Sequence, residues 1–149
     1  MIKVLFITEK WCDGSPSLGL TNNFHNLFNS LNNSKKCEIH TLHFDELMLK
    51  HRIHIDSIAT DICKNLKPDL VIFSFLGDSY LNPSNEIIKS IKDLGCKICI
   101  MWPDTGYAWA QNRIQQLSSF CTLQVSFDNS TNFSNYNLKN YFAPQDETL

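Results

Sequence analysis

The most informative pattern along the chain is an alternation of short apolar runs with longer amphipathic stretches. Residues 70–76 and 97–102 are nearly continuous apolar runs, as in strands that are covered on both faces. Between them, apolar residues recur at helical spacing, which predicts an amphipathic helix. The inward face of this helix is expected to consist of Ile87, Ile88, Ile91 and Leu94. The segment therefore predicts a β–α–β unit whose two strands are parallel.

The same alternation extends over the rest of the chain. Strands are predicted at residues 2–8, 37–44, 70–76, 97–102, 122–127 and 139–143. Helices are predicted at residues 20–31, 45–49, 53–66, 87–94 and 108–120. This order predicts an α/β fold with a doubly wound, mostly parallel sheet and helices on both faces, which is a Rossmann-like architecture.

Length and charge restrict the class of protein. The 149 residues are expected to form a single Rossmann-like domain, residues 1–149. The formal net charge is −2 and the sequence has no basic stripe, which disfavours nucleic-acid binding. No apolar run approaches the roughly 20 residues that a membrane span needs, and no signal-peptide pattern is present, so a cytoplasmic location is expected.

The cysteines are expected to be structural, with Cys12 of the first loop as the exception. Five of them lie in or beside apolar segments, where cysteine behaves as a small buried hydrophobe. Cys96 and Cys99 form a C-x-x-C pair that opens a predicted strand, where residues three apart face opposite sides. No second cysteine pair accompanies them, and the histidine pairs lack a third ligand. The sequence therefore predicts no metal site.

Candidate functional residues gather where predicted strands end, because parallel α/β sheets bind ligands at the carboxyl ends of their strands. The loop at residues 9–19 has neither the G-x-G-x-x-G nor the G-x-x-x-x-G-K-[ST] spacing of a phosphate cradle. Its hydroxyls nevertheless suit a phosphate or a sugar, and an ordinary flexible loop is the alternative. The residues expected to bind substrate are Asp13, Gly14, Ser15, Ser17, Gly19, Gly77, Asp78, Trp102 and Thr105.

Asp104 is the expected catalytic residue. It follows a predicted buried strand beside Trp102 and Pro103, where partial desolvation would raise its pKa and suit it to act as a general base. The alternative is that Asp104 caps a turn, with Gly106 at a special backbone angle. Glu9 is a further carboxylate expected at the same edge, with Asp13 and Asp78.

Two segments, "IKVLFITEKW…GSPSLGLTNNFHNLFNSL" and "PDLVIFSFLGDSYLNPSNEIIKSIKDLGCKICIMWPDT", resemble the N-terminal half of two-domain glycosyltransferases of the GT-B fold. The resemblance is to the CgeB-type (spore maturation protein-like) family and covers nearly the whole chain. It implies transfer of a sugar from a nucleotide-sugar donor to an acceptor hydroxyl, with no metal or other cofactor required.

The resemblance also implies how the work is divided between the domains. The N-terminal domain would hold a small-molecule or glycan acceptor and supply the base, with the loop from Gly14 to Gly19 facing the cleft and Asp104 at the strand exit. The donor-binding domain is not part of these 149 residues, so the chain alone is expected to be inactive. Residues 144–149 are expected to start a connection to that domain.

Two other readings remain open. One is a stand-alone flavodoxin-like or Rossmann-like module, in which a flavin stacks on Trp11 or Trp102 beside Tyr107 and Trp109. The missing run of phosphate-cradling Ser and Thr residues weighs against a flavin. The other reading is a non-catalytic interaction domain.

Overall fold

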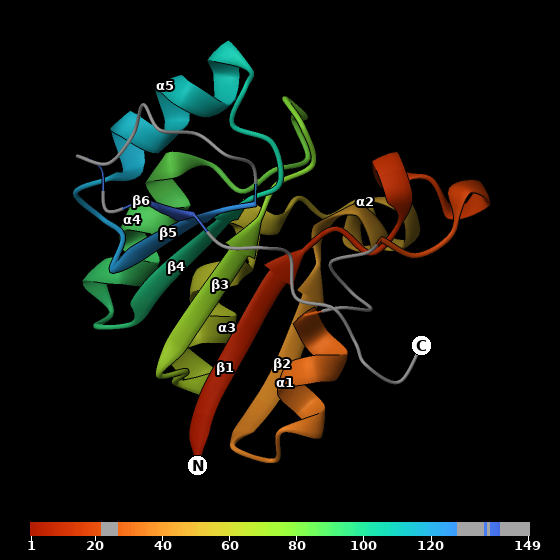
Figure 1. Cartoon of the computed structure of the whole chain (residues 1–149). Helices are drawn as coiled ribbons and strands as arrows, with labels where there is room; N and C mark the ends of the chain where they lie inside the picture. The colour runs from red at the N-terminus through yellow and green to blue at the C-terminus, as the bar shows by residue number, and fades with distance from the viewer. Residues whose placement is uncertain (22–26, 128–135, 137, 141–149) are drawn as a thin grey trace.

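The computed structural model describes residues 1–21, 27–127, 136 and 138–140. In this part of the chain, six parallel strands form one sheet in the order β2-β1-β3-β4-β5-β6 (Figure 1). The strands are β1 (Ile2–Thr8), β2 (Cys37–His43), β3 (Leu70–Ser74), β4 (Lys97–Trp102), β5 (Leu123–Ser126) and β6 (Leu138–Asn140). The expected doubly wound α/β fold is confirmed.

The helices that the structure describes lie between these strands. They are α1 (Asn29–Asn33), α2 (Phe44–His51), α3 (Ala59–Leu66), α4 (Asn85–Asp93) and α5 (Ala108–Leu117). Short 3-10 turns are η1 (Cys12–Gly14), η2 (Pro16–Leu18) and η4 (Ile55–Ser57). Part of the helix predicted at 20–31, the end of the strand predicted at 139–143 and the connection predicted at 144–149 lie outside the described residues. Among the described helices, none combines the length and the apolar character that crossing a membrane requires.

The strand order places a topological switch point between β1 and β3. The chain crosses from β1 to β2 in one direction and then returns past β1 to β3, so the connecting helices cover opposite faces of the sheet. On one face, Val4 and Phe6 pack against Leu31 of α1. On the other face, Leu5 and Ile7 join the core that α3, α4 and α5 close. Figure 1 shows α1 in front of the sheet and α3 behind it.

The structure changes the bounds of several predicted elements: β3 ends at Ser74 rather than Leu76, α3 begins at Ala59 rather than Ile53, and α5 ends at Leu117 rather than Phe120. Leu94, expected on the inward face of α4, is 42% exposed, because α4 ends at Asp93 and the chain turns away through Gly95 in the left-handed region. Ile88 and Ile91 are buried as expected. The strand predicted at 37–44 ends at His43, since Phe44 already begins α2.

The Trp102 side chain is part of the core rather than of the surface. It is fully buried, and its indole Nε1–H donates to Oε1 of Gln124 at 2.8 Å. Gln124 in turn donates to the backbone oxygens of Ile114 (3.1 Å) and Tyr136 (2.9 Å). The network satisfies both polar side chains and links β4, β5 and α5 inside the core.

Candidate functional site

Two buried polar side chains without partners lie at the carboxyl end of β1. Glu9 directly follows the strand and is only 9% exposed, and Thr8 is fully buried. Glu9 Oε2 and Thr8 Oγ1 have no hydrogen-bond partner in the described part of the chain. Leaving a buried polar atom unpaired costs about 1–3 kcal/mol. Such a cost at the switch point of a parallel sheet marks a candidate ligand site.

The Glu9 carboxyl is held mainly in its protonated form at neutral pH. Burial, which is the largest cause, acts together with the negative charges of Asp45 and Asp13 to raise its pKa from 4.5 to about 8. A carboxyl of this kind donates a hydrogen bond while it is protonated. Once it has lost its proton, it is a stronger base than an exposed carboxylate.

Asp45 fixes the backbone immediately after Glu9. Its side chain is fully buried in the first turn of α2, where a negative charge is stabilised by the helix dipole. Both carboxylate oxygens accept the N–H of Lys10, at 2.9 and 3.0 Å, and Oδ2 also accepts the N–H of Trp11 at 2.9 Å. The chain therefore leaves β1 along a path that α2 determines.

The first loop is closed on itself by backbone hydrogen bonds. Trp11 pairs with Leu20 in an antiparallel bridge, and the N–H of Cys12 donates to the oxygen of Gly19 at 2.9 Å. The N–H of Thr21 donates to the oxygen of Lys10 at 3.0 Å. The loop is thus a compact, hydrogen-bonded unit containing η1 and η2, rather than an open run of backbone amides.

The first loop packs against the loop that follows β3. Gly14 has a positive φ of 68°, and a Cβ at this position would lie 3.1 Å from Cδ2 of Leu76. Asn82 shapes the second loop, because its side-chain oxygen accepts the N–H of Leu76 at 2.7 Å and its amide donates to the oxygen of Gly77 at 2.9 Å. The structure therefore brings together two of the loops expected to bind substrate.

The expected substrate-binding residues divide into two groups. Exposed at the carboxyl edge are Asp13, Ser17, Gly19, Gly77 and Asp78, with Gly14 and Ser15 half-buried beside them. The hydroxyls of Ser15 and Ser17 lie 2.8 Å apart and hydrogen-bond to each other. Trp102 is 0% exposed and belongs to the hydrophobic core, and Thr105 is 1% exposed.

Asp104 lies at the expected strand exit, but its surroundings differ from the expectation. The residue is exposed, and its Oδ1 accepts the N–H of Gly106 at 3.1 Å. A general base was expected here because partial desolvation would raise the pKa of the carboxyl. The Asp104 side chain is exposed, so this condition is not fulfilled. The contact with Gly106 is the turn-capping arrangement, although the φ of Gly106 is not left-handed. A catalytic role for Asp104 stays a prediction without this support.

The sequence pattern did not single out Glu9 and Asp45 as buried carboxylates of this edge. Glu9 stood among the carboxylates expected at this edge, but its burial depends on contacts that the local sequence does not contain. The sequence feature that could have identified Glu9 is its position, because it is the first residue after the central strand. In the described ranges, no three His, Cys, Asp or Glu side chains are grouped as a metal ion would need.

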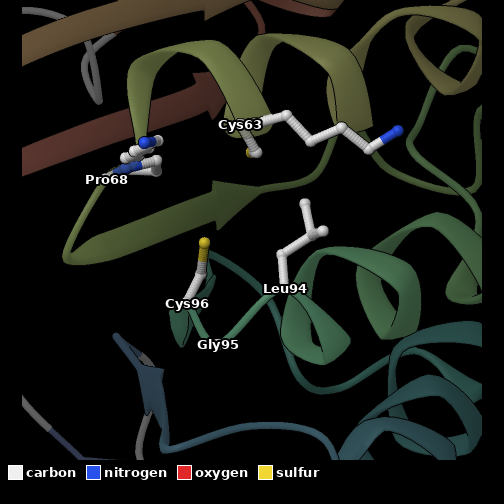
Figure 2. Close-up of a pocket in the computed structure, with 7 residues that line it drawn as sticks. Cys63, Pro68, Leu94, Gly95 and Cys96 are labelled. Atoms are coloured by element: carbon white, nitrogen blue, oxygen red, sulfur yellow. The ribbon is translucent and has the colours of Figure 1, made fainter.

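A pocket lies at the opposite edge of the sheet. Figure 2 shows Cys63 of α3 and Cys96 before β4, with their sulfurs directed toward each other in a pocket of about 380 Å³. Burial raises the pKa of Cys63 to about 12 and also raises that of Cys96. Thiols that stay protonated are weak nucleophiles and weak metal ligands. Cys96 and Cys99 belong to the cores on opposite faces, as expected.

No protein-family model and no curated protein matches this chain.

Proposed function

We propose that this domain binds a small polar molecule at the carboxyl edge of β1 and β3, and that Glu9 exchanges a proton with it. The observation that carries the proposal is the buried, unpartnered Glu9 carboxyl directly after the central strand. Ligands of doubly wound sheets bind in the crevice at the switch point, which lies here between β1 and β3.

The proposed reaction is sugar transfer, in which this domain holds the acceptor. The resemblance to the N-terminal half of GT-B glycosyltransferases supports this choice, and the position of Glu9 is compatible with it. Glu9 would take the proton of the acceptor hydroxyl as that oxygen bonds to the anomeric carbon and the nucleoside diphosphate leaves. A raised pKa makes a carboxylate a more effective base for this step. A separate domain would hold the nucleotide-sugar, so this chain alone would bind without turnover.

The charge of the edge supports an acceptor rather than a phosphate ligand. Acidic side chains at this edge are Glu9, Asp13, Asp45, Glu46, Asp78 and Asp104. Two cations near these acids are already engaged. Nζ of Lys10 lies 2.9 Å from Oε1 of Glu46. Arg113, which interacts electrostatically with Asp78, stacks over the ring of Phe75 at 4.2 Å. An excess of negative charge repels the phosphates of a nucleotide and leaves a neutral polyol unaffected.

A stand-alone binding module is the second candidate, and the strand order favours it. The first five strands follow the order 2-1-3-4-5, which flavodoxin-like domains also have. Burial of Trp102 removes one of the two indoles proposed to stack on a flavin. The negative charge of Asp13 opposes a flavin phosphate. Visible absorbance of the purified protein separates the two candidates, since a yellow protein would favour the flavin.

The proposal is tested by mapping ligand contacts with ¹H–¹⁵N NMR spectra. Neutral mono- and oligosaccharides, UDP-glucose and FMN serve as probes. We expect a saccharide to shift the backbone resonances of Glu9, Trp11 and Leu76, and we expect Glu9→Gln to abolish these shifts. Asp61→Asn is the matched control, because Asp61 is an exposed carboxylate on α3. Shifts confined to other parts of the sheet, or none with any saccharide, would refute the proposal.

A further inference from the structure

We infer that the ligand of this edge carries a protonated amine, which sits beside Glu9 between the first loop and the start of α2. The inference builds on the proposed function and specifies the chemical class of the ligand. It starts from an imbalance between negative and positive groups around Glu9.

Two carboxylates from other elements act electrostatically on the buried Glu9 carboxyl. Glu9 follows β1, Asp13 lies in η1 and Asp45 lies in α2, and the charges of Asp13 and Asp45 both act on Glu9. Asp45 is occupied by backbone N–H groups of the first loop. Oε2 of Glu9 and the buried hydroxyl of Thr8 have no partner within the described ranges. The site thus offers hydrogen-bond acceptors that the protein itself does not use.

Positive groups of the chain do not balance these acids. Lys10 and Lys50 both bind Oε1 of Glu46, at 2.9 and 2.7 Å, and they hold the pKa of Glu46 at about 2. Lys10 also lies 5.0 Å from the ring centre of Trp11. The imidazole of His43 faces the same edge from β2, and burial lowers its pKa, so it is neutral at neutral pH. Across the described residues, no ion pair joins a cation to Glu9 or Asp13.

A protonated amine supplies the missing donor and the missing charge. Its N–H groups suit Oε2 of Glu9 and the Thr8 hydroxyl, and exposed Asp13 lies on the solvent side of the same group. A nearby positive charge favours the ionised form of a carboxyl. Entry of the amine therefore releases the Glu9 proton to solvent, and the bound state is an ammonium–carboxylate pair. A neutral ligand would leave this proton in place.

The inference is tested by following the Glu9 carboxyl with ¹³C NMR during pH titration of the full chain. The titration is done in sodium chloride, in ethylammonium chloride of equal ionic strength, and in sodium chloride with ethanol. We expect Glu9 to titrate at least about one pH unit lower in ethylammonium, which corresponds to a tenfold preference of the cation for the ionised carboxyl. The same titration curve in all three solutions would overturn the inference.

Variants separate this inference from the proposed function. Ethylammonium binding, followed by the indole resonance of Trp11, is expected to weaken at least tenfold in Glu9→Gln and to be unchanged in Glu38→Gln, an exposed carboxylate of β2. Equal binding in Glu9→Gln and the unsubstituted chain would also overturn the inference. If neutral saccharides shift the resonances around Glu9 and ethylammonium does not, the proposed function stands and the amine is wrong. If neither saccharides nor ethylammonium shift these resonances, both the proposed function and the amine inference are wrong.

Discussion

Both carboxylate oxygens of Asp45 accept a hydrogen bond from the backbone N–H of Lys10, at 2.9 and 3.0 Å. The contact joins residues 35 positions apart and ties the start of α2 to the exit of the central strand. This contact also affects Glu9, the residue that precedes Lys10. With the backbone held at Lys10, the Glu9 carboxyl stays buried next to a second negative charge, and its pKa rises.

Replacing Asp45 by Ala is expected to destabilise the protein by about 3 kcal/mol. The substitution leaves the N–H groups of Lys10, Trp11 and Glu46 without their acceptor, and relief of repulsion with Glu9 offsets part of the loss. Urea unfolding followed by circular dichroism measures the effect. Asp61→Ala, at a side chain that is 74% exposed, should change the stability by less than about 0.5 kcal/mol. Equal effects of the two substitutions would contradict the role given to Asp45.

The stability of the protein is expected to fall as the pH rises from about 4.5 to about 8. Below this window, Glu9 is protonated in both the folded and the unfolded chain. Within it, the unfolded chain loses the proton while the folded chain keeps it, and above about 8 the loss is complete.

The variant Glu9→Gln lacks this titration. Relative to the unsubstituted chain, it should gain on the order of 3 kcal/mol in unfolding free energy between the acidic and the alkaline end of the window. Urea unfolding at a series of pH values measures the difference. Parallel stability profiles for the two proteins would show that Glu9 has an ordinary pKa.

Four cysteines are expected to resist alkylation in the folded protein. Burial raises the pKa of Cys63 and Cys121 to about 12 and of Cys99 to about 11, and it raises that of Cys96. Iodoacetamide reacts with thiolates, so labelling at neutral pH should be at least tenfold slower than in urea-unfolded protein. Peptide mass spectrometry assigns the sites, with the half-buried Cys12 as an internal comparison. Equal rates at Cys63 in folded and unfolded protein would contradict the buried thiol pair.

The sequence pattern was sufficient for the sheet because strand signals are local. The apolar runs at residues 2–8 and 97–102 coincide with β1 and β4 at both ends. Helix ends were less certain, because Leu94 continues the helical spacing, yet the chain has already turned toward Gly95. A periodic pattern does not show where capping overrides it.

The site was harder to predict because burial at a strand end comes from distant parts of the chain. Asp104 and Glu9 both follow apolar strands, so the sequence offers the same reason to expect desolvation at each. In the structure, Asp104 ends in an exposed turn with Gly106, whereas Glu9 is covered at the start of the loop that Asp45 anchors. The difference involves contacts of Asp45 in α2 with the backbone that follows β1, and no local pattern encodes these contacts.

The measurement that tests the account most directly is the pKa of Glu9 itself. The chain is labelled with ¹³C at glutamate side-chain carboxyls, and the Glu9 signal is assigned by its absence in Glu9→Gln. The account predicts a midpoint near pH 8, with a second sample carrying Asp45→Asn titrating lower because one neighbouring charge is gone. A Glu9 midpoint near 4.5, the ordinary glutamate value, would contradict the buried acid on which the proposed site depends.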